Sequence, residues 1–300
     1  MISKNTCVLA IHSMMMSSES KKGIPSTAVP FRRRFWTLLI LKSQLLCRSV
    51  RNWLLVAGVI AMFVAGAMVS VGADTSSVVR VPLLALEANH SAVSRFWLRI
   101  FDLSTLFLPF LAFLCGYGSI HGGSGRGNLT CLGSLPLTRG EIYLATVVAH
   151  LAAFAIVLAT GTAIGILTMM AFGASGSLIR QFGTGFLTIS LGLALIAPGI
   201  GLSALASTRK QGILGIIGGG FAMVYGIPFL LARRSVFIIL HPFQSYAQLL
   251  TTQVEAAYSP LIQLYSPQLL SPFVAVAVLA GWVCCPITLG YLCVRNEVIG

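Results

Sequence analysis

The sequence predicts an all-α integral membrane protein with six transmembrane helices. Of its 300 residues, 56% are hydrophobic and only 9% are charged, and the mean hydropathy is +0.90. A soluble domain carries about 25% charged residues, so this composition excludes a soluble globular protein. Apolar segments near the ~20 residues that cross a hydrocarbon core recur along the chain, with short polar or basic stretches between them.

The first 52 residues divide into two parts. Residues 1–30 are polar and Ser-rich, and we expect a disordered cytoplasmic tail. They hold no uninterrupted apolar core of the kind that a signal peptide needs. Residues 31–52 combine six Arg or Lys residues with Trp36 and many Leu residues. A basic amphipathic segment beside a span is typical of a helix that lies in the membrane interface, and a simple basic anchor for the first span is the alternative.

Six predicted spans follow. The third is too long for a bilayer, so its first turns are expected to stand in the cytoplasm. Pro109, Pro198, Pro228 and Pro286 fall within spans and are expected to kink those helices. The spans are placed at residues 53–72, 103–120, 142–172, 182–206, 212–232 and 273–294.

The distribution of Lys and Arg predicts the orientation, because cytoplasmic segments of membrane proteins carry an excess of both residues. With both termini inside, the inner segments hold 11 Lys or Arg residues near the membrane and the outer segments hold 6. Orientation also accounts for the formal net charge of +13. No aromatic-interleaved basic surface supports nucleic-acid binding. We therefore expect a multi-pass protein of the cell (plasma or inner) membrane with both termini cytoplasmic.

The connection between the second and third spans carries the most specific pattern. Leu129, Leu132 and Leu135 lie three apart, which predicts a short helix with one apolar stripe. Pro136 ends that helix, because the residue before a proline is pushed out of the α region. Thr138-Arg-Gly-Glu141 then matches the capping box that starts many helices. We expect a short amphipathic helix, a break and a capped entry into the third span, and an ordinary hairpin is the alternative.

The run Leu132-Gly-Ser-Leu-Pro-Leu-Thr-Arg-Gly-Glu-Ile142 resembles the loop between spans two and three in permease subunits of ABC type-2 transporters. Gly133 and residues 125–128 depart from the family pattern, which has a leucine pair and often an acidic residue there. The resemblance implies a short cytoplasmic coupling helix that docks on a separate ATPase subunit. It assigns ATPase coupling to Leu129, Leu132, Leu135, Pro136, Leu137, Thr138, Arg139 and Glu141.

The same resemblance implies the rest of the architecture. An elbow helix precedes the first span in this family, at the place of residues 31–52. Two permease subunits, identical or related, enclose the pathway, and two ATPase subunits bind beneath them. Residues 233–272 are too apolar for an exposed loop, and we expect two short re-entrant or interfacial helices between spans five and six. The resemblance implies that they line the exit of the pathway, and an interfacial aromatic belt is the alternative.

Small residues recur at four-residue spacing, which lets helices pack closely. We expect them at helix contacts within the bundle or between two protomers. They are Ala57, Ala61 and Ala65, Gly161 and Gly165, and Gly215 and Gly219.

The sequence carries no pattern for chemistry of its own. It has no Gly-x-x-x-x-Gly-Lys-Ser/Thr loop, so we expect a transport subunit without enzyme activity, cofactor or metal, with ATP bound to the partner. Its seven cysteines contain no Cys-x-x-Cys pair. Glu141 is the one acidic residue in or at the start of a predicted span, which disfavours a proton- or sodium-coupled carrier. His150, inside the third span, is interpreted as a packing residue.

Two alternative functions stay open. Gly173-Ala-Ser-Gly176 matches the tetrad around the nucleophile of rhomboid intramembrane proteases, with Ser175 as the serine. That serine needs a histidine base on a later span, and the one histidine after it, His241, lies in a predicted outer segment, so a turn explains the tetrad better. The other alternative is a maturation permease for a metalloenzyme, although no Met or His ladder supports metal passage. Apolar spans suit a lipid-linked or amphipathic cargo, and export of a peptide, drug or glycan fits too.

Overall fold

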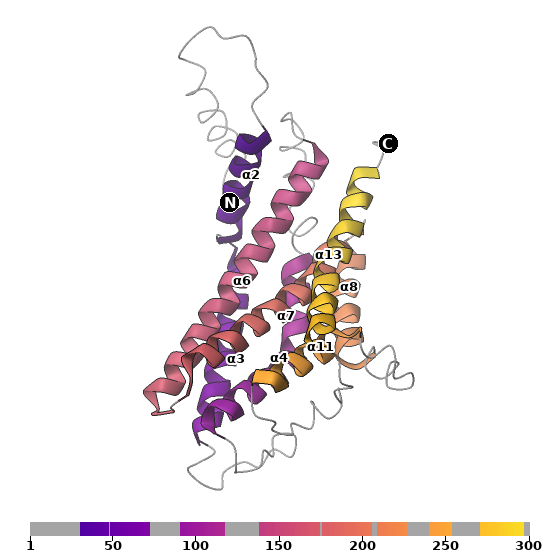
Figure 1. The fold of residues 1–300 in the computed structure, drawn as a ribbon. Helices are drawn as coiled ribbons and strands as arrows, with labels where there is room; N and C mark the ends of the chain where they lie inside the picture. The colour runs from indigo at the N-terminus through magenta and orange to yellow at the C-terminus, as the bar shows by residue number, and fades with distance from the viewer. Residues whose placement is uncertain are drawn as a thin grey trace, which may run out of the picture.

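The computed structural model describes residues 31–47, 49–72, 91–117, 138–174, 176–205, 209–226, 240–253 and 271–296, and every regular element within these ranges is helical. The helices run in one direction and then the other between two ends of a bundle (Figure 1). Their bounds are α2 Phe31–Cys47, α3 Val50–Gly72, α4 Ala92–Tyr117, α6 Arg139–Ala171, α7 Leu178–Leu205, α8 Arg209–Phe221 with the π-helical turn η2 Ala222–Gly226, α11 Pro242–Gln253 and α13 Pro272–Asn296.

Among the described residues, five helices are long and apolar enough to cross a membrane: α3, α4, α6, α7 and α13. The all-helical membrane class is therefore confirmed, but six spans are not. Around the fifth predicted span, at 212–232, the structure describes α8, which begins before it at Arg209, and η2, and residues 227–239 lie outside the described ranges. A sixth crossing stays a prediction.

The second span begins earlier than the sequence predicts. Helix α4 starts at Ala92 rather than near residue 103, so Arg95, Arg99 and Asp102 belong to a helix and not to an outer connection. All three side chains are buried. The prediction failed because a hydropathy pattern ends at charged residues, whereas packing against α7 lets this helix continue through them.

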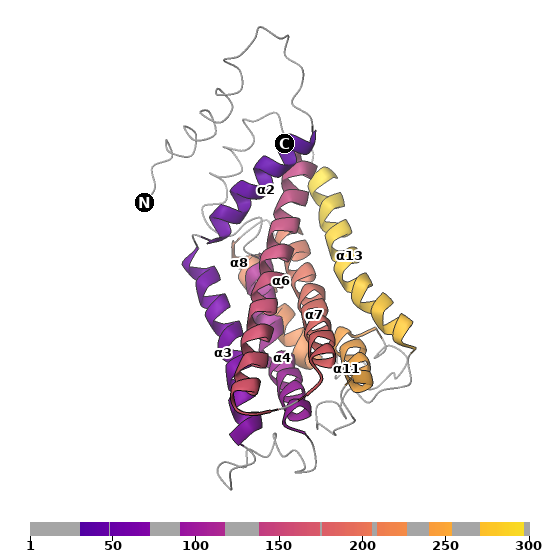
Figure 2. The ribbon, with the colours of Figure 1, turned by 60° about the vertical axis from the view of Figure 1, so that its left-hand side comes forward.

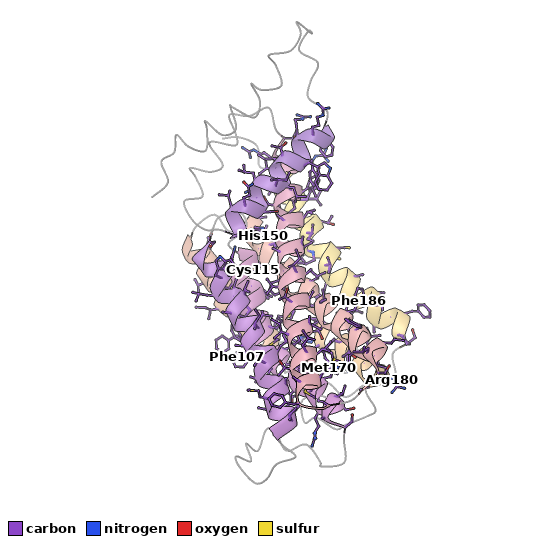
Figure 3. All side chains as sticks on the ribbon, turned by 90° about the vertical axis from the view of Figure 1, so that its left-hand side faces the viewer. Phe107, Cys115, His150, Met170, Arg180 and Phe186 are labelled. Carbon is purple, nitrogen blue, oxygen red and sulfur yellow. The ribbon has the colours of Figure 1, made fainter. Side chains whose placement is uncertain are left out.

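The bundle is built around α7, which packs on α4, α6, α11 and α13, while α3 packs on α4 and α6. The start of α2, the start of α6 and the end of α13 lie at one end, which we call the inner end after the predicted orientation (Figure 1). Figure 3 shows His150 on the inner half of the bundle and Met170 and Arg180 towards the opposite, outer end. Inner and outer are used in this sense below.

Helix α2 is a separate helix that lies across the inner half of α6 (Figure 2). Its last carbonyls are satisfied by side chains from the start of α3: Asn52 Nδ2 donates to Leu46 O at 2.8 Å, and Trp53 Nε1 donates to Cys47 O at 2.9 Å. Carbonyls at a helix end need such partners. These bonds fix a bend between α2 and α3, where the elbow helix was expected. Its position in a membrane interface stays a prediction.

The glycines at four-residue spacing sit in different surroundings. A Cβ on Gly161 would lie 2.7 Å from Phe63 Cδ2, and one on Gly165 would lie 2.8 Å from Phe96 Cζ. These two positions let α6 approach α3 and α4 without a side chain between them. A Cβ on Gly219 would lie 2.5 Å from Phe113 Cε1, whereas one on Gly215 would meet no described atom within 4 Å.

Candidate coupling site at the start of helix α6

The capping box at the start of α6 is formed as the spacing predicts. Thr138 has extended backbone angles, φ −76° and ψ 147°, and its hydroxyl accepts from the Glu141 amide at 3.2 Å. The Glu141 carboxylate accepts from the Thr138 amide at 2.7 Å. Two amides that a helix start would otherwise leave unpaired are therefore satisfied. The first turn of α6 is therefore locked in one geometry relative to Thr138.

The second oxygen of Glu141 reaches another helix. Its Oε1 lies 3.4 Å from a terminal guanidinium nitrogen of Arg34 on α2, and the Glu141 side chain is buried. One carboxylate therefore caps α6 and pairs with α2. A buried carboxylate needs such partners, because burial without them carries a large desolvation penalty.

An apolar contact continues the junction between α2 and α6. Leu38 of α2 packs with Ile142 and Ala145 of α6, and Phe35 and Leu41 lie against the same cluster. Arg34, Leu38 and Leu41 are spaced four and three apart, so they share one face of α2. That face is turned to α6, and α2 contacts the start of α6 over about two turns.

The opposite side of the inner end of α6 meets α13. The Tyr143 hydroxyl donates to the Ile287 carbonyl at 2.9 Å, and the rings of Tyr143 and Tyr291 lie with centroids 6.2 Å apart. A Cβ on Gly140 would lie 2.9 Å from Tyr291 Cε2. Together these contacts make the inner end of α6 a junction of three helices, α2, α6 and α13.

The predicted coupling residues fall partly on this junction. Thr138, Arg139 and Glu141 are described, and two of them form the cap. Leu129, Leu132, Leu135, Pro136 and Leu137 lie outside the described residues.

Sequence reasoning missed Arg34, Tyr143 and Tyr291. Its spacing of four and seven residues from Leu38 and Leu41 places Arg34 on their face of the helix, unlike the neighbouring Arg33, and this signal could have identified it. No pattern in the sequence points to the partners of the two tyrosines, because the Tyr143 bond joins residues 144 positions apart.

A second group of polar residues is buried in the outer half of the bundle. Arg95, Arg99 and Asp102 lie on one face of α4, and Asp102 acts electrostatically on Arg99. His241, at the start of α11, is buried, and burial lowers the pKa of its imidazole to about 4 against a smaller opposing effect of the Met223 backbone. Asp102 corrects the prediction that Glu141 is the one acidic residue within a span.

The structure also describes the surroundings of His150 and Gly173, which the sequence had raised as candidates. His150 is buried, and its Nδ1 lies 2.8 Å from the Thr146 carbonyl one turn earlier in α6. Gly173 has a positive φ of 78° and follows the end of α6, where the tetrad was expected to form a turn. Ser175, the serine of the protease alternative, lies outside the described residues.

Helix α11 occupies the region where short outer helices were expected. It packs between α7 and α13 rather than lying apart from the bundle. Its Tyr246 stacks on Phe101 of α4 with centroids 5.6 Å apart, and the Tyr246 and Thr188 hydroxyls are 2.8 Å apart. The second expected helix lies outside the described residues.

The chain is similar to a known family of membrane proteins. A family model with the description ABC-2 family transporter protein matches residues 45–297. The match covers the helices from α3 to α13, including the start of α6, whereas Arg34 and Leu38 of α2 lie before it. No match is found among curated proteins.

Proposed function

Because the chain belongs to the ABC-2 family of transporter proteins, we propose that it is the membrane permease subunit of an ATP-driven exporter. Family membership makes it a membrane permease of an ABC transporter. The direction of transport, the pairing of subunits and the coupling to an ATPase are our proposals. They rest on the orientation predicted by Lys and Arg and on the junction at the inner end of α6.

The observation that carries the proposal is the position of the capped helix start. Thr138 immediately follows the segment predicted to dock on the ATPase, and the cap holds Thr138 in a fixed geometry relative to the first turn of α6. A helix of 33 residues is about 50 Å long, which exceeds the ~30 Å hydrocarbon core. A tilt applied at Thr138 therefore passes along α6 as along a rigid rod, and it pulls on α2 and α13 at the junction.

We propose that two such subunits, identical or related, pair to enclose the pathway, with one ATPase subunit beneath each. The pairing is supported by exposed apolar faces on α3 and α13, which a second subunit or lipid can cover. Ala57, Ala61 and Ala65 are exposed on α3, and Phe273 on α13 is 87% exposed. Apolar spans suit a lipid-linked or amphipathic cargo, and peptides, drugs and glycans are the other classes to assay.

Replacement of Leu132 and Leu135 by Asp tests the docking step. The charges would have to enter an apolar groove on the ATPase, so we expect co-purification of the ATPase to be lost. Replacement of the same two leucines by Met conserves volume and hydrophobicity and is the matched control. Monodisperse elution of both variants from a sizing column shows that the fold is intact. Undiminished co-purification and transport in the Asp variant would contradict the coupling role.

The native Cys131 allows a direct test of orientation. In a variant with the other six cysteines replaced by Ser, a membrane-impermeant maleimide should label Cys131 in inside-out vesicles and not in intact cells. Labelling in intact cells would place the segment outside and would rule out contact with a cytoplasmic ATPase.

A further inference from the structure

Within the part of the chain that the structure describes, a hydrogen bond on each side of Pro286 ties α13 to another element. On the outer side, Trp282 Nε1 donates to the Leu240 carbonyl at 2.6 Å, just before α11. On the inner side, the Ile287 carbonyl accepts from the Tyr143 hydroxyl of α6 at 2.9 Å. The two halves of this helix are therefore fastened to different elements.

The proline makes α13 weakest between those two bonds. Pro286 lies inside the helix and has no N–H to donate to the carbonyl of Trp282. Helices bend most readily at such positions. Ala275, Leu279 and Gly290 are the buried positions among the described side chains of α13, and its most extensive contact is with α7.

At Pro286, α13 contacts a glycine of α7. A Cβ on Gly201 of α7 would lie 2.7 Å from the Pro286 carbonyl oxygen. A Cβ on Gly290 would collide with the Tyr143 hydroxyl and lie 3.3 Å from Gly201 Cα. At Gly201, α7 therefore presents backbone rather than a side chain to Pro286, which leaves room for a bend of α13 at the proline. Ile287 and Tyr291 of the inner half pack against the core and would move with that half.

Tyr143 stands close to the place where force would enter. It lies five residues after Thr138, which is about 7.5 Å along the helix axis, and two residues after Glu141 of the capping box. A displacement of the first turns of α6 moves the Tyr143 hydroxyl with them, because the cap and the helix backbone hold this segment together.

We propose that Tyr143 is a positioning residue that transfers the displacement of α6 to the inner half of α13, which bends at Pro286 while its outer half stays with Leu240. This inference rests on the proposed coupling to an ATPase. It adds a specific output: the last helix, rather than α6 alone, changes shape on the inner side when the ATPase closes.

Spin-label pairs measured against α3 test the proposal in the complex with its co-purified ATPase, in lipid nanodiscs, before and after trapping with ATP and vanadate. All labels replace exposed side chains in a background without native cysteines. The α6 pair is Leu54 with Val148, the inner α13 pair is Leu54 with Leu289, and the outer α13 pair is Met68 with Val276. We expect the α6 and inner pairs to shift by about 2 Å or more on trapping, and the outer pair to stay in place.

The decisive variant is Tyr143→Phe, which removes the hydroxyl and keeps the ring. It should reduce the shift of the inner α13 pair by at least half, with the α6 shift and ATPase co-purification unchanged. Tyr291→Phe is the matched control, since this ring contacts Tyr143 without taking part in the bond to Ile287; the inner shift should persist. Pro286→Ala should make the two halves of α13 move together.

The outcomes separate this inference from the proposed function. If the inner pair shifts equally in Tyr143→Phe, or if both halves of α13 move together in the native chain, the inference is overturned and the proposed function stands. If no ATPase co-purifies, or if the α6 pair does not shift in the native chain, both are overturned.

Discussion

The shared carboxylate of Glu141 gives the sharpest test of how the start of α6 is held. The pairing with Arg34 and the capping of Thr138 use different oxygens of Glu141, so they can be removed separately. Glu141→Gln keeps an acceptor for the cap, since glutamine also serves in a capping box, and weakens the pair with Arg34. Thr138→Ala removes the N-cap hydroxyl and leaves the pair.

The magnitudes follow from the geometry. Loss of an N-cap hydroxyl costs about 1 kcal/mol, which is the expected effect of Thr138→Ala. The Arg34 to Glu141 pair is 3.4 Å long, and its arginine side chain is 26% exposed. It therefore contributes about 1 kcal/mol, between the values for surface pairs and for hydrogen bonds to charged groups.

A double-mutant cycle between Arg34→Gln and Glu141→Gln measures that contribution directly. The assay is the apparent melting temperature of the purified chain in detergent, where about 1 kcal/mol corresponds to a shift of about 2–4 °C. Arg33→Gln is the control, because Arg33 is the exposed neighbour of Arg34 on α2 and carries the same charge.

The contact between Arg34 and Glu141 contributes nothing to stability if the two substitutions are additive to within about 0.3 kcal/mol. An Arg33→Gln protein that melts at as low a temperature as the Arg34→Gln protein would mean that the charge of α2, rather than the contact with Glu141, stabilises the junction.

Three further predictions concern packing, pH and buried charge. Gly161→Ala should lower stability by about 1–3 kcal/mol, because its Cβ has no room, whereas Gly215→Ala should be neutral or slightly stabilising; both are read from apparent melting temperatures. Burial lowers the pKa of His241 to about 4, below about 6.5 in an unfolded chain. Below pH 6.5 the unfolded chain therefore binds a proton that the folded chain does not, and the free energy of unfolding should fall by about 2 kcal/mol between pH 7 and pH 5. Asp102→Asn should destabilise the bundle by about 3 kcal/mol, since it leaves a buried charge cluster unbalanced, whereas Arg180→Gln at an exposed position should change stability by less than about 0.5 kcal/mol.

Each of these three has a result that would contradict it. Equal melting temperatures for the two glycine variants would show that α6 and α3 have space to separate. For the pH prediction, His241→Gln removes the titrating group, so an unchanged loss of stability at pH 5 in that variant would assign the effect elsewhere. An Asp102→Asn protein as stable as the Arg180→Gln protein would mean that this carboxylate does not balance the arginines of α4.

The sequence predicted best where the interactions are local. Thr138 and Glu141 are three residues apart, and the hydrogen bonds between them depend only on one turn of backbone. The spacing therefore located the start of α6 at the cap itself. The start of α4 was missed by contrast, because Arg95 and Asp102 look like residues of a loop when only their polarity is considered.

Composition, apolar run lengths and one capping pattern were enough to determine a helical membrane protein and the place where α6 begins, because solvation of side chains and hydrogen bonds within a turn depend on neighbours along the chain. Only the tertiary structure decided that Arg34 pairs with Glu141, that Tyr143 holds Ile287 and that three charges of α4 are buried. These contacts join residues far apart in sequence. They form only when particular faces of the helices pack against one another. The hydropathy pattern does not specify those faces, because many combinations of apolar faces satisfy it.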